Sequence, residues 1–256
     1  MFDLVSGGLS EHAFAAALGV TLFAGFVKGA VGFAMPMILV SAFAVFLPQH
    51  LALAGLILPT LVTNLSQAFR QGVGPAVDTA RTYRRFLLAT VVFIAVSAPF
   101  ADAIPRAVYL LMLGIPIATF AALQLAGRTL AIPVRNRGRA EWGLGVIGGL
   151  YGGVSGIWGP PLLVLLLSTG ADKLTMIRAQ GVVFLIGAVA LLVSHLGTGV
   201  ANSGTLGFSA ALAVPALAGL YVGYWVQDRL DQPRFRRWTQ GLLVITGLNM
   251  VRLALT

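Results

Sequence analysis

Hydrophobic and polar positions follow one another along the chain in long blocks. Eight apolar runs cover about residues 12–47, 51–69, 86–104, 107–126, 142–168, 176–196, 206–226 and 239–256. Six of them have roughly the 17–25 residues that one helix needs to cross a bilayer. The other two, 12–47 and 142–168, are interrupted near the middle by glycine and proline. The pattern predicts an all-α polytopic membrane protein with two broken helical segments.

The composition agrees with that pattern and excludes several classes of protein. Of the 256 residues, 58% are hydrophobic and 10% are charged, whereas soluble domains carry about 25% charged residues. An ordinary soluble enzyme, a disordered chain and a nucleic-acid-binding domain are therefore excluded. The chain has no cysteine, which excludes disulfides and thiolate metal sites. The first ten residues carry Asp3 and no Lys or Arg, so we expect no cleaved signal peptide.

The basic residues predict the orientation, because cytoplasmic loops of membrane proteins are enriched in Lys and Arg. Three gaps between the runs, at 70–85, 127–141 and 229–237, hold most of the arginines. These are Arg70, Arg81, Arg84, Arg85, Arg128, Arg135, Arg137, Arg139, Arg229, Arg234, Arg236 and Arg237. The gap at 195–205 holds no Lys or Arg and is expected outside. Both ends of the run 142–168 then lie inside, so this run must dip into the membrane and return.

The lengths of the broken runs fit this reading. The arm Trp142–Tyr151 reaches only ~15 Å at about 1.5 Å per residue, against ~30 Å of hydrocarbon. The arms of the first broken run, Phe14–Val27 and Ala34–Leu47, fit either a dipping hairpin or two short tilted spans. In both cases we expect the two termini outside, in a bacterial inner membrane.

The two broken runs align with each other at a constant offset of 124 residues. Gly25–Pro36 (GFVKGAVGFAMP) matches Gly149–Pro160 (GLYGGVSGIWGP), and three glycines and one proline coincide. An offset near half the chain length indicates duplication; the alternative is chance in a chain with 31 glycines. Since the charge pattern requires opposite orientations, we predict inverted repeats over 1–126 and 142–256, joined by a basic cytoplasmic linker over 127–141. Each repeat is a glycine-broken hairpin plus three transmembrane helices, which is typical of secondary transporters.

The hairpin tips, Gly29–Phe33 and Gly153–Trp158, are the predicted binding site. Helix N-termini present unpaired N–H groups and about half a positive charge, so two facing tips near the midplane suit a small oxyanion. The alternative is that the tip glycines only allow close helix packing, which is the role we assign to Gly145, Gly149, Gly219 and Gly223. The candidate substrate-binding residues are Lys28, Gly29, Gly32, Phe33, Asn64, Gln67, Gly153, Ser155, Gly156, Trp158, Arg178 and Gln180.

Lys28 is the sharpest single feature, because a Lys at membrane depth costs at least ~2.5 kcal/mol at a helix centre. It pairs with the anion in the favoured reading; otherwise it snorkels to the interface or pairs with a carbonyl. Apart from Asp102 at the end of the run 86–104, no Asp or Glu occurs inside a predicted span, which argues against a carboxylate proton relay. Asn64 and Gln67 equally suit interhelical hydrogen bonds, and Arg178 suits a topology anchor. His195 is expected at the outer interface.

Three parts of the sequence resemble one known family. They are the glycine motif pair, the segment Pro59-Thr-Leu-Val-Thr-Asn64, and the ending that begins with Gly219-Leu-Tyr-Val-Gly223 and continues through Arg236-Arg237 to Gly241-Leu-Leu-Val-Ile-Thr-Gly247. Together they look like the sulfite exporter TauE/SafE family, which includes proteins similar to 4-toluene sulfonate uptake permeases. The likeness covers nearly the whole chain, and it implies transport of sulfite, sulfonates or other small organic anions. The chain departs from the usual motif at Lys28 and over Phe33–Pro36, where further glycines are commoner.

The predicted function is therefore secondary transport of a small anion, with export of sulfite or an organosulfonate favoured. The alternative is an anion channel or a non-catalytic membrane scaffold. Motifs such as HExxH, GxSxG or a Walker loop are absent from the sequence, so no enzyme activity and no metal or other cofactor are predicted. The expected partners are the small anion and the lipid bilayer, without nucleic acid. The oligomeric state is left open, a homo-oligomer included.

Overall fold

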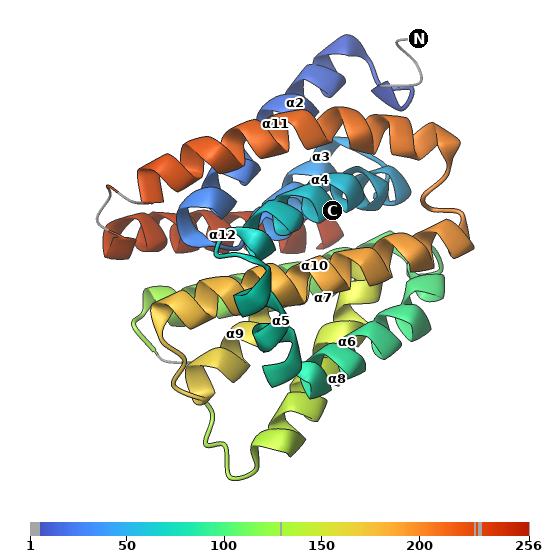
Figure 1. Cartoon of the computed structure of the whole chain (residues 1–256). Helices are drawn as coiled ribbons and strands as arrows, with labels where there is room; N and C mark the ends of the chain where they lie inside the picture. Colours follow the sequence, from blue (N-terminus) through green and yellow to red (C-terminus); the bar gives the residue numbers. More distant parts are fainter. Residues whose placement is uncertain (1–5, 129, 228, 230–231, 256) are drawn as a thin grey trace.

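A computed structural model describes residues 6–128, 130–227, 229 and 232–255, and all their regular elements are helices (Figure 1). The side chains of 173, 232–236 and 238 lie outside the description, so the expectations for Arg234 and Arg236 are not addressed. The elements are α2 (Glu11–Val31), α3 (Met35–Phe46), α4 (Gln49–Phe69), α5 (Val73–Thr82), α6 (Arg84–Ser97), η1 (Ala98–Phe100), α7 (Arg106–Leu125), α8 (Arg137–Ser155), α9 (Gly159–Ser168), α10 (Lys173–Thr198), α11 (Ser203–Gln227) and α12 (Gln232–Leu255).

The helices have the lengths and the surfaces of a multi-pass membrane protein. Five of them, α2, α4, α7, α10 and α11, are long and apolar enough to cross a bilayer, and α5 with α6 forms a sixth candidate that is bent by 79°. Large apolar side chains point outward from several of these helices; Val193 is 63% exposed and Val214 is 71% exposed. Hydrocarbon rather than water is the medium that accepts such a surface.

Both broken runs are interrupted where the sequence predicts it. The first helix of each hairpin ends at a glycine in the left-handed region, Gly32 (φ 89°) and Gly156 (φ 71°). Their N–H groups donate to the Lys28 and Gly152 carbonyls, both at 2.7 Å. The return helices then carry Pro36 and Pro160 in their first turns, where proline costs no hydrogen bond. Glycine is needed at these two positions because a left-handed conformation strains other residues.

The first arm of each hairpin is longer than predicted. Helix α8 has 19 residues instead of the ten of Trp142–Tyr151, and α2 has 21. Helix α8 extends backward because the Asn136 side chain caps it by accepting from the Arg139 N–H at 3.1 Å. The return arms are short, with 12 residues in α3 and 10 in α9, or only ~15–18 Å of helix.

Helix α5 occupies the gap for which the sequence predicts only a cytoplasmic loop. It buries Ala76 and Thr79 and packs against α10. Val73 and Val77 on its other face are 65% and 41% exposed. This amphipathic helix of 10 residues was missed because its segment mixes small, polar and apolar residues.

Glycines bring helices from the two halves of the chain into close contact. Helix α2 packs along α11, α8 along α6, α7 along α12, and α4 along α10. A Cβ on Gly149 would lie 2.6 Å from the Thr90 carbonyl oxygen, and one on Gly145 would lie 2.7 Å from that of Phe86. A Cβ on Gly219 or Gly223 would overlap backbone of α2. The packing role predicted for these four glycines is confirmed.

Helix starts recur at the same spacing as the sequence motif. Helices α3 and α9 begin at Met35 and Gly159, and α4 and α10 begin at Gln49 and Lys173; both differences are 124. The packing pairs follow the same correspondence, since exchanging the halves turns the pair α2 with α11 into the pair α8 with α6. This common register brings the two helix breaks into one part of the molecule.

Candidate functional site

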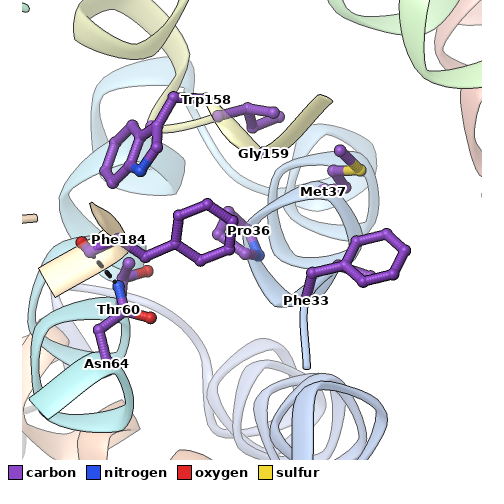
Figure 2. A pocket seen from close by; sticks show the side chains of 11 residues that line it. Phe33, Pro36, Met37, Thr60, Asn64, Trp158, Gly159 and Phe184 are labelled. Atoms are coloured by element: carbon purple, nitrogen blue, oxygen red, sulfur yellow. Dashed lines mark hydrogen bonds between the residues drawn. The ribbon is translucent and has the colours of Figure 1, made fainter. Parts of the chain in front are cut away.

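The two helix breaks line a single pocket with an empty volume of about 310 Å³. Its walls come from the first break with the start of α3, from α4, from the second break with the start of α9, and from α10 (Figure 2). The lining residues are Phe33, Ala34, Pro36, Met37, Thr60, Asn64, Gly156, Ile157, Trp158, Gly159 and Phe184. Four of them, Phe33, Asn64, Gly156 and Trp158, belong to the site predicted from the sequence.

Most of this lining is apolar, and its polar atoms gather on one side. Trp158 and Phe184 meet edge to face with ring centroids 6.3 Å apart. In Figure 2 the indole nitrogen of Trp158 faces the side on which Thr60 and Asn64 lie. The Thr60 hydroxyl and the Trp158 N–H are buried and have no hydrogen-bond partner among the described residues. Buried polar groups usually have a partner, so these two donors are available to a ligand.

Two helix N-termini add to the polar character of the pocket. Helices α3 and α9 both begin at residues that line it. The first N–H groups of a helix lack intrahelical acceptors and attract negative charge. At the first break Ala34 adopts φ 80°, a conformation that strains a residue with a Cβ. The pocket thus combines apolar walls with donors suited to an anion.

Lys28 lies behind this pocket, and Asn64 separates the two. Its side chain is 1% exposed, and Nζ donates to Thr63 Oγ1 at 2.9 Å and to Asn64 Oδ1. The Asn64 amide in turn donates to the Phe184 carbonyl at 3.0 Å, the bond drawn in Figure 2. Lys28 therefore does not snorkel to the interface, and of its two side-chain hydrogen bonds the one to Asn64 reaches a residue of the pocket lining.

Comparison with known protein families identifies the family of the chain. The model of the sulfite exporter TauE/SafE family matches residues 17–250. The chain belongs to this family. TauE/SafE proteins are membrane transporters of sulfite- and sulfonate-type anions, so this chain has a small anionic substrate and a lipid environment. No curated protein and no solved structure matches the chain.

Several predicted site residues of this TauE/SafE chain support the first tip from outside the pocket. The Gln67 amide donates to the Gly32 carbonyl at 3.0 Å and to the Ile177 carbonyl at 3.3 Å. A Cβ on Gly32 would lie 2.9 Å from Gln180 Oε1, so that side chain also borders the break. Arg178 donates to Gln71 at 3.4 Å, near the start of α10. Gln67 thus holds the tip in place, Gln180 borders it, and neither lines the pocket.

Three further predicted residues lie in helix contacts. Gly29 faces the Leu220 carbonyl of α11. Gly153 faces Ser97 and the Ile94 carbonyl of α6. Ser155 donates to the Tyr151 carbonyl at 2.6 Å and accepts from the Ile157 N–H at 3.1 Å, so it stabilises the turn of the second tip. These contacts allow close packing and a sharp break.

Two residues are buried where the sequence did not predict it. His195 lies in the last turn of α10, as expected near a helix end, but it is fully buried; its Nε2 lies 3.0 Å from the Gly153 carbonyl oxygen, to which it donates. Glu141, from the predicted linker, is 3% exposed inside α8, and it pairs with Arg137 at 2.7 Å. Both were missed because the apolar runs were bounded by hydropathy, which does not show helix contacts.

The first turn of α10 carries an ordinary helix cap. Asp172 accepts from the Thr175 N–H at 3.0 Å and from its hydroxyl at 2.7 Å. These hydrogen bonds lower the pKa of the Asp172 carboxyl. Among the described residues, no group of three His, Asp or Glu side chains is placed to hold a metal ion.

Proposed function

We propose that the chain is a secondary transporter that exports sulfite or an organosulfonate from the bacterial cytoplasm. The observation that carries this proposal is the pocket between two helix breaks with two buried, unpartnered donors on Thr60 and Trp158. Transporters commonly bind substrate where discontinuous helices meet near the midplane. The proposal places both termini outside and the chain in the inner membrane.

The substrate lies with its oxyanion group toward Thr60, Asn64 and Trp158. Hydroxyl and indole N–H groups donate to sulfonate oxygens, and the N-termini of α3 and α9 add favourable partial charge. Phe33, Met37 and the Phe184 ring form the opposite, apolar part of the lining. An organic group attached to sulfur fills that part better than a bare inorganic anion does.

The architecture we propose is a pair of inverted repeats, residues 1–126 and 142–256, with the linker 127–141 in the cytoplasm. The common spacing of 124 residues between helix starts supports the duplication. The inversion is tested by labelling single cysteines in this Cys-free chain. Arg135→Cys and Gly170→Cys should react only from the cytoplasm and Ser203→Cys only from outside. Labelling of Gly170→Cys from outside would refute the inverted orientation.

The function is tested with purified protein and a panel of sulfite, sulfoacetate, benzenesulfonate, thiosulfate, sulfate, taurine and acetate. We expect saturable binding of sulfite or sulfonates, detected by thermal stabilisation, and counterflow of the same anion in proteoliposomes. Thr60→Val and Trp158→Phe remove one donor each and keep the shape. Each should weaken binding by about 1.5–3 kcal/mol, the range for a hydrogen bond to a charged group.

Three other outcomes would contradict the proposal. Flux without saturation or counterflow would indicate a channel, and binding without flux would indicate a scaffold. Unchanged affinity in both Thr60→Val and Trp158→Phe would move the binding site away from this pocket.

A further inference from the structure

The hydrogen bonds around Lys28 determine how many protons its amine needs. Thr63 Oγ1 donates its own proton to the Pro59 carbonyl at 2.6 Å, so it can only accept from Lys28. The Asn64 amide donates to the Phe184 carbonyl, which turns Oδ1 toward Nζ. Both partners of Lys28 are therefore acceptors, and two N–H donors satisfy them. An uncharged amine has two N–H groups, whereas an ammonium has three.

The surroundings of Lys28 provide no negative charge. Among the described residues, no carboxylate forms an ion pair with it, and its two hydrogen-bond partners are neutral. Helix α3, which packs against α2, carries no titratable residue. The titratable and charged residues on α2, on its other neighbours α4, α11 and α12, and on α10 are Glu11, His12, His50, Tyr221, Tyr224, Arg234, Arg236, Arg237, Arg252, Lys173, Arg178 and His195. The carboxylate among them, Glu11, is exposed in the first turn of α2, whereas Lys28 lies in its last turn.

We propose that Lys28 is an uncharged amine while the pocket is empty and takes up one proton when an anion binds. This inference rests on the proposed anion transport. An isolated ammonium is costly to bury in a low-dielectric interior, and a lysine so placed gives up its proton instead. The empty protein then holds no uncompensated charge at the level of the pocket.

Anion binding changes this balance through Asn64. An anion against Asn64 lies one side chain away from Nζ, and an opposite charge within ~4–6 Å favours the charged form of a group. The neutral amine, one proton from the aqueous phase and the anion combine to an ammonium–anion pair without net charge. The third N–H of the ammonium therefore forms only when the anion, whose negative charge it compensates, is bound.

A transport consequence follows from the neutral pair. If the proton leaves with the anion, each cycle carries no net charge across the membrane. The membrane potential, which acts with about 2.3 kcal/mol per charge per 100 mV, then has no effect on the flux. The anion gradient and the pH difference drive it instead, and an outside that is more acidic than the cytoplasm opposes export. A permanently charged Lys28 would give the opposite behaviour, because the net cycle would carry the charge of the anion.

The decisive measurement is the number of protons taken up on binding. Benzenesulfonate is a suitable probe, since it stays ionised at neutral pH and neither releases nor takes up a proton. Calorimetric titration at pH 8 in two buffers of different ionisation enthalpy should give about one proton per anion bound by the wild-type protein. Lys28→Arg, which stays protonated, and Lys28→Met should both give none. Wild-type binding without proton uptake would overturn the inference and leave the transport function standing.

Flux in proteoliposomes provides the second test. Benzenesulfonate flux should follow an imposed pH gradient and stay unchanged when valinomycin and potassium set the potential. Flux that follows the potential would overturn the proton-linked mechanism alone. Absence of binding and flux for every sulfonate in the panel would refute the anion-transport function and this inference together.

Discussion

The two halves of the pocket share the glycine and the proline of the helix break and differ in other side chains. Lys28 and Thr63 of the first half correspond, at the spacing of 124 residues, to Gly152 and Gly187 of the second. Where the first half has the Lys28–Thr63 hydrogen bond, the second has the indole of Trp158. A Cβ on Gly152 would lie 2.8 Å from the indole ring, and one on Gly187 would lie 2.7 Å from it.

The same division holds at the pocket wall. Thr60 corresponds to Phe184 and Asn64 to Ala188, so the α4 side is polar and the α10 side is apolar. The glycine and proline that form each break are kept in both halves, because the break needs a left-handed residue and a return helix whose first turn accommodates proline. The comparison teaches that the two helix breaks together form the cavity. The side chains around them differ, so that the first half is polar and the second half is aromatic.

The largest effect is expected from a substitution in the aromatic half of the pocket. Trp158→Ala should destabilise the protein by about 3–5 kcal/mol, the usual cost of truncating a large buried aromatic residue, since the indole fills the space between Gly152 and Gly187. Thermal unfolding in detergent measures this. Trp158→Phe is the matched control and should keep most of the stability. Equal stability of Trp158→Ala and wild type would show that the second tip is not held by this ring.

The next largest effect is expected from a substitution in the polar half, and it concerns substrate binding rather than folding. Lys28→Met removes a buried amine and leaves a side chain of similar length, so the fold should stay intact. Sulfonate binding should weaken roughly ten- to a hundredfold, because the anion loses the opposite charge that lies across Asn64. Lys28→Arg should not restore full affinity, because a planar fork replaces a compact charge. Unchanged transport kinetics in Lys28→Met vesicles would reject Lys28 as a participant.

A third test compares how the two tips are held. Gln67 bonds the Gly32 carbonyl from α4, and His195 bonds the Gly153 carbonyl from α10. Gln67→Leu and His195→Leu each leave a buried carbonyl without its donor, which should cost about 1–3 kcal/mol. Thermal unfolding should show similar losses for both variants. A loss in only one of them would mean that the other tip is held by packing alone.

The smallest effect sharpens a difference in backbone conformation. Ala34 has φ 80°, whereas its counterpart Trp158 has φ −125°, so only the first tip carries this strain. Ala34→Gly should raise the stability by up to about 1 kcal/mol, because glycine adopts this conformation without penalty. A decrease in the melting temperature would contradict the assignment of strain to Ala34.

Hydropathy and glycine spacing were enough to predict the helical membrane fold and both helix breaks, and the resemblance of three sequence segments to TauE/SafE proteins predicted the family. They succeeded because a bilayer requires long apolar runs, and because Gly32, Pro36, Gly156 and Pro160 act on the backbone locally. The ends of α8 and the presence of α5 escaped prediction. Both depend on caps and amphipathic contacts, such as the Asn136 cap, which polar residues conceal from a hydropathy profile.

The composition of the pocket was decided by the tertiary structure alone. Lys28, Gln67 and Gly153 lie close to the breaks in sequence or in space, but none of them lines the pocket. Lys28 and Gln67 form hydrogen bonds with other residues, and Gly153 packs against a neighbouring helix. Thr60 and Phe184 line the pocket although no motif marks them as a pair. Whether a polar atom is buried without a partner depends on which helices surround it, and α4 and α10 lie more than a hundred residues apart in the chain. Local sequence determines the breaks, whereas packing between the halves determines which donors an anion meets.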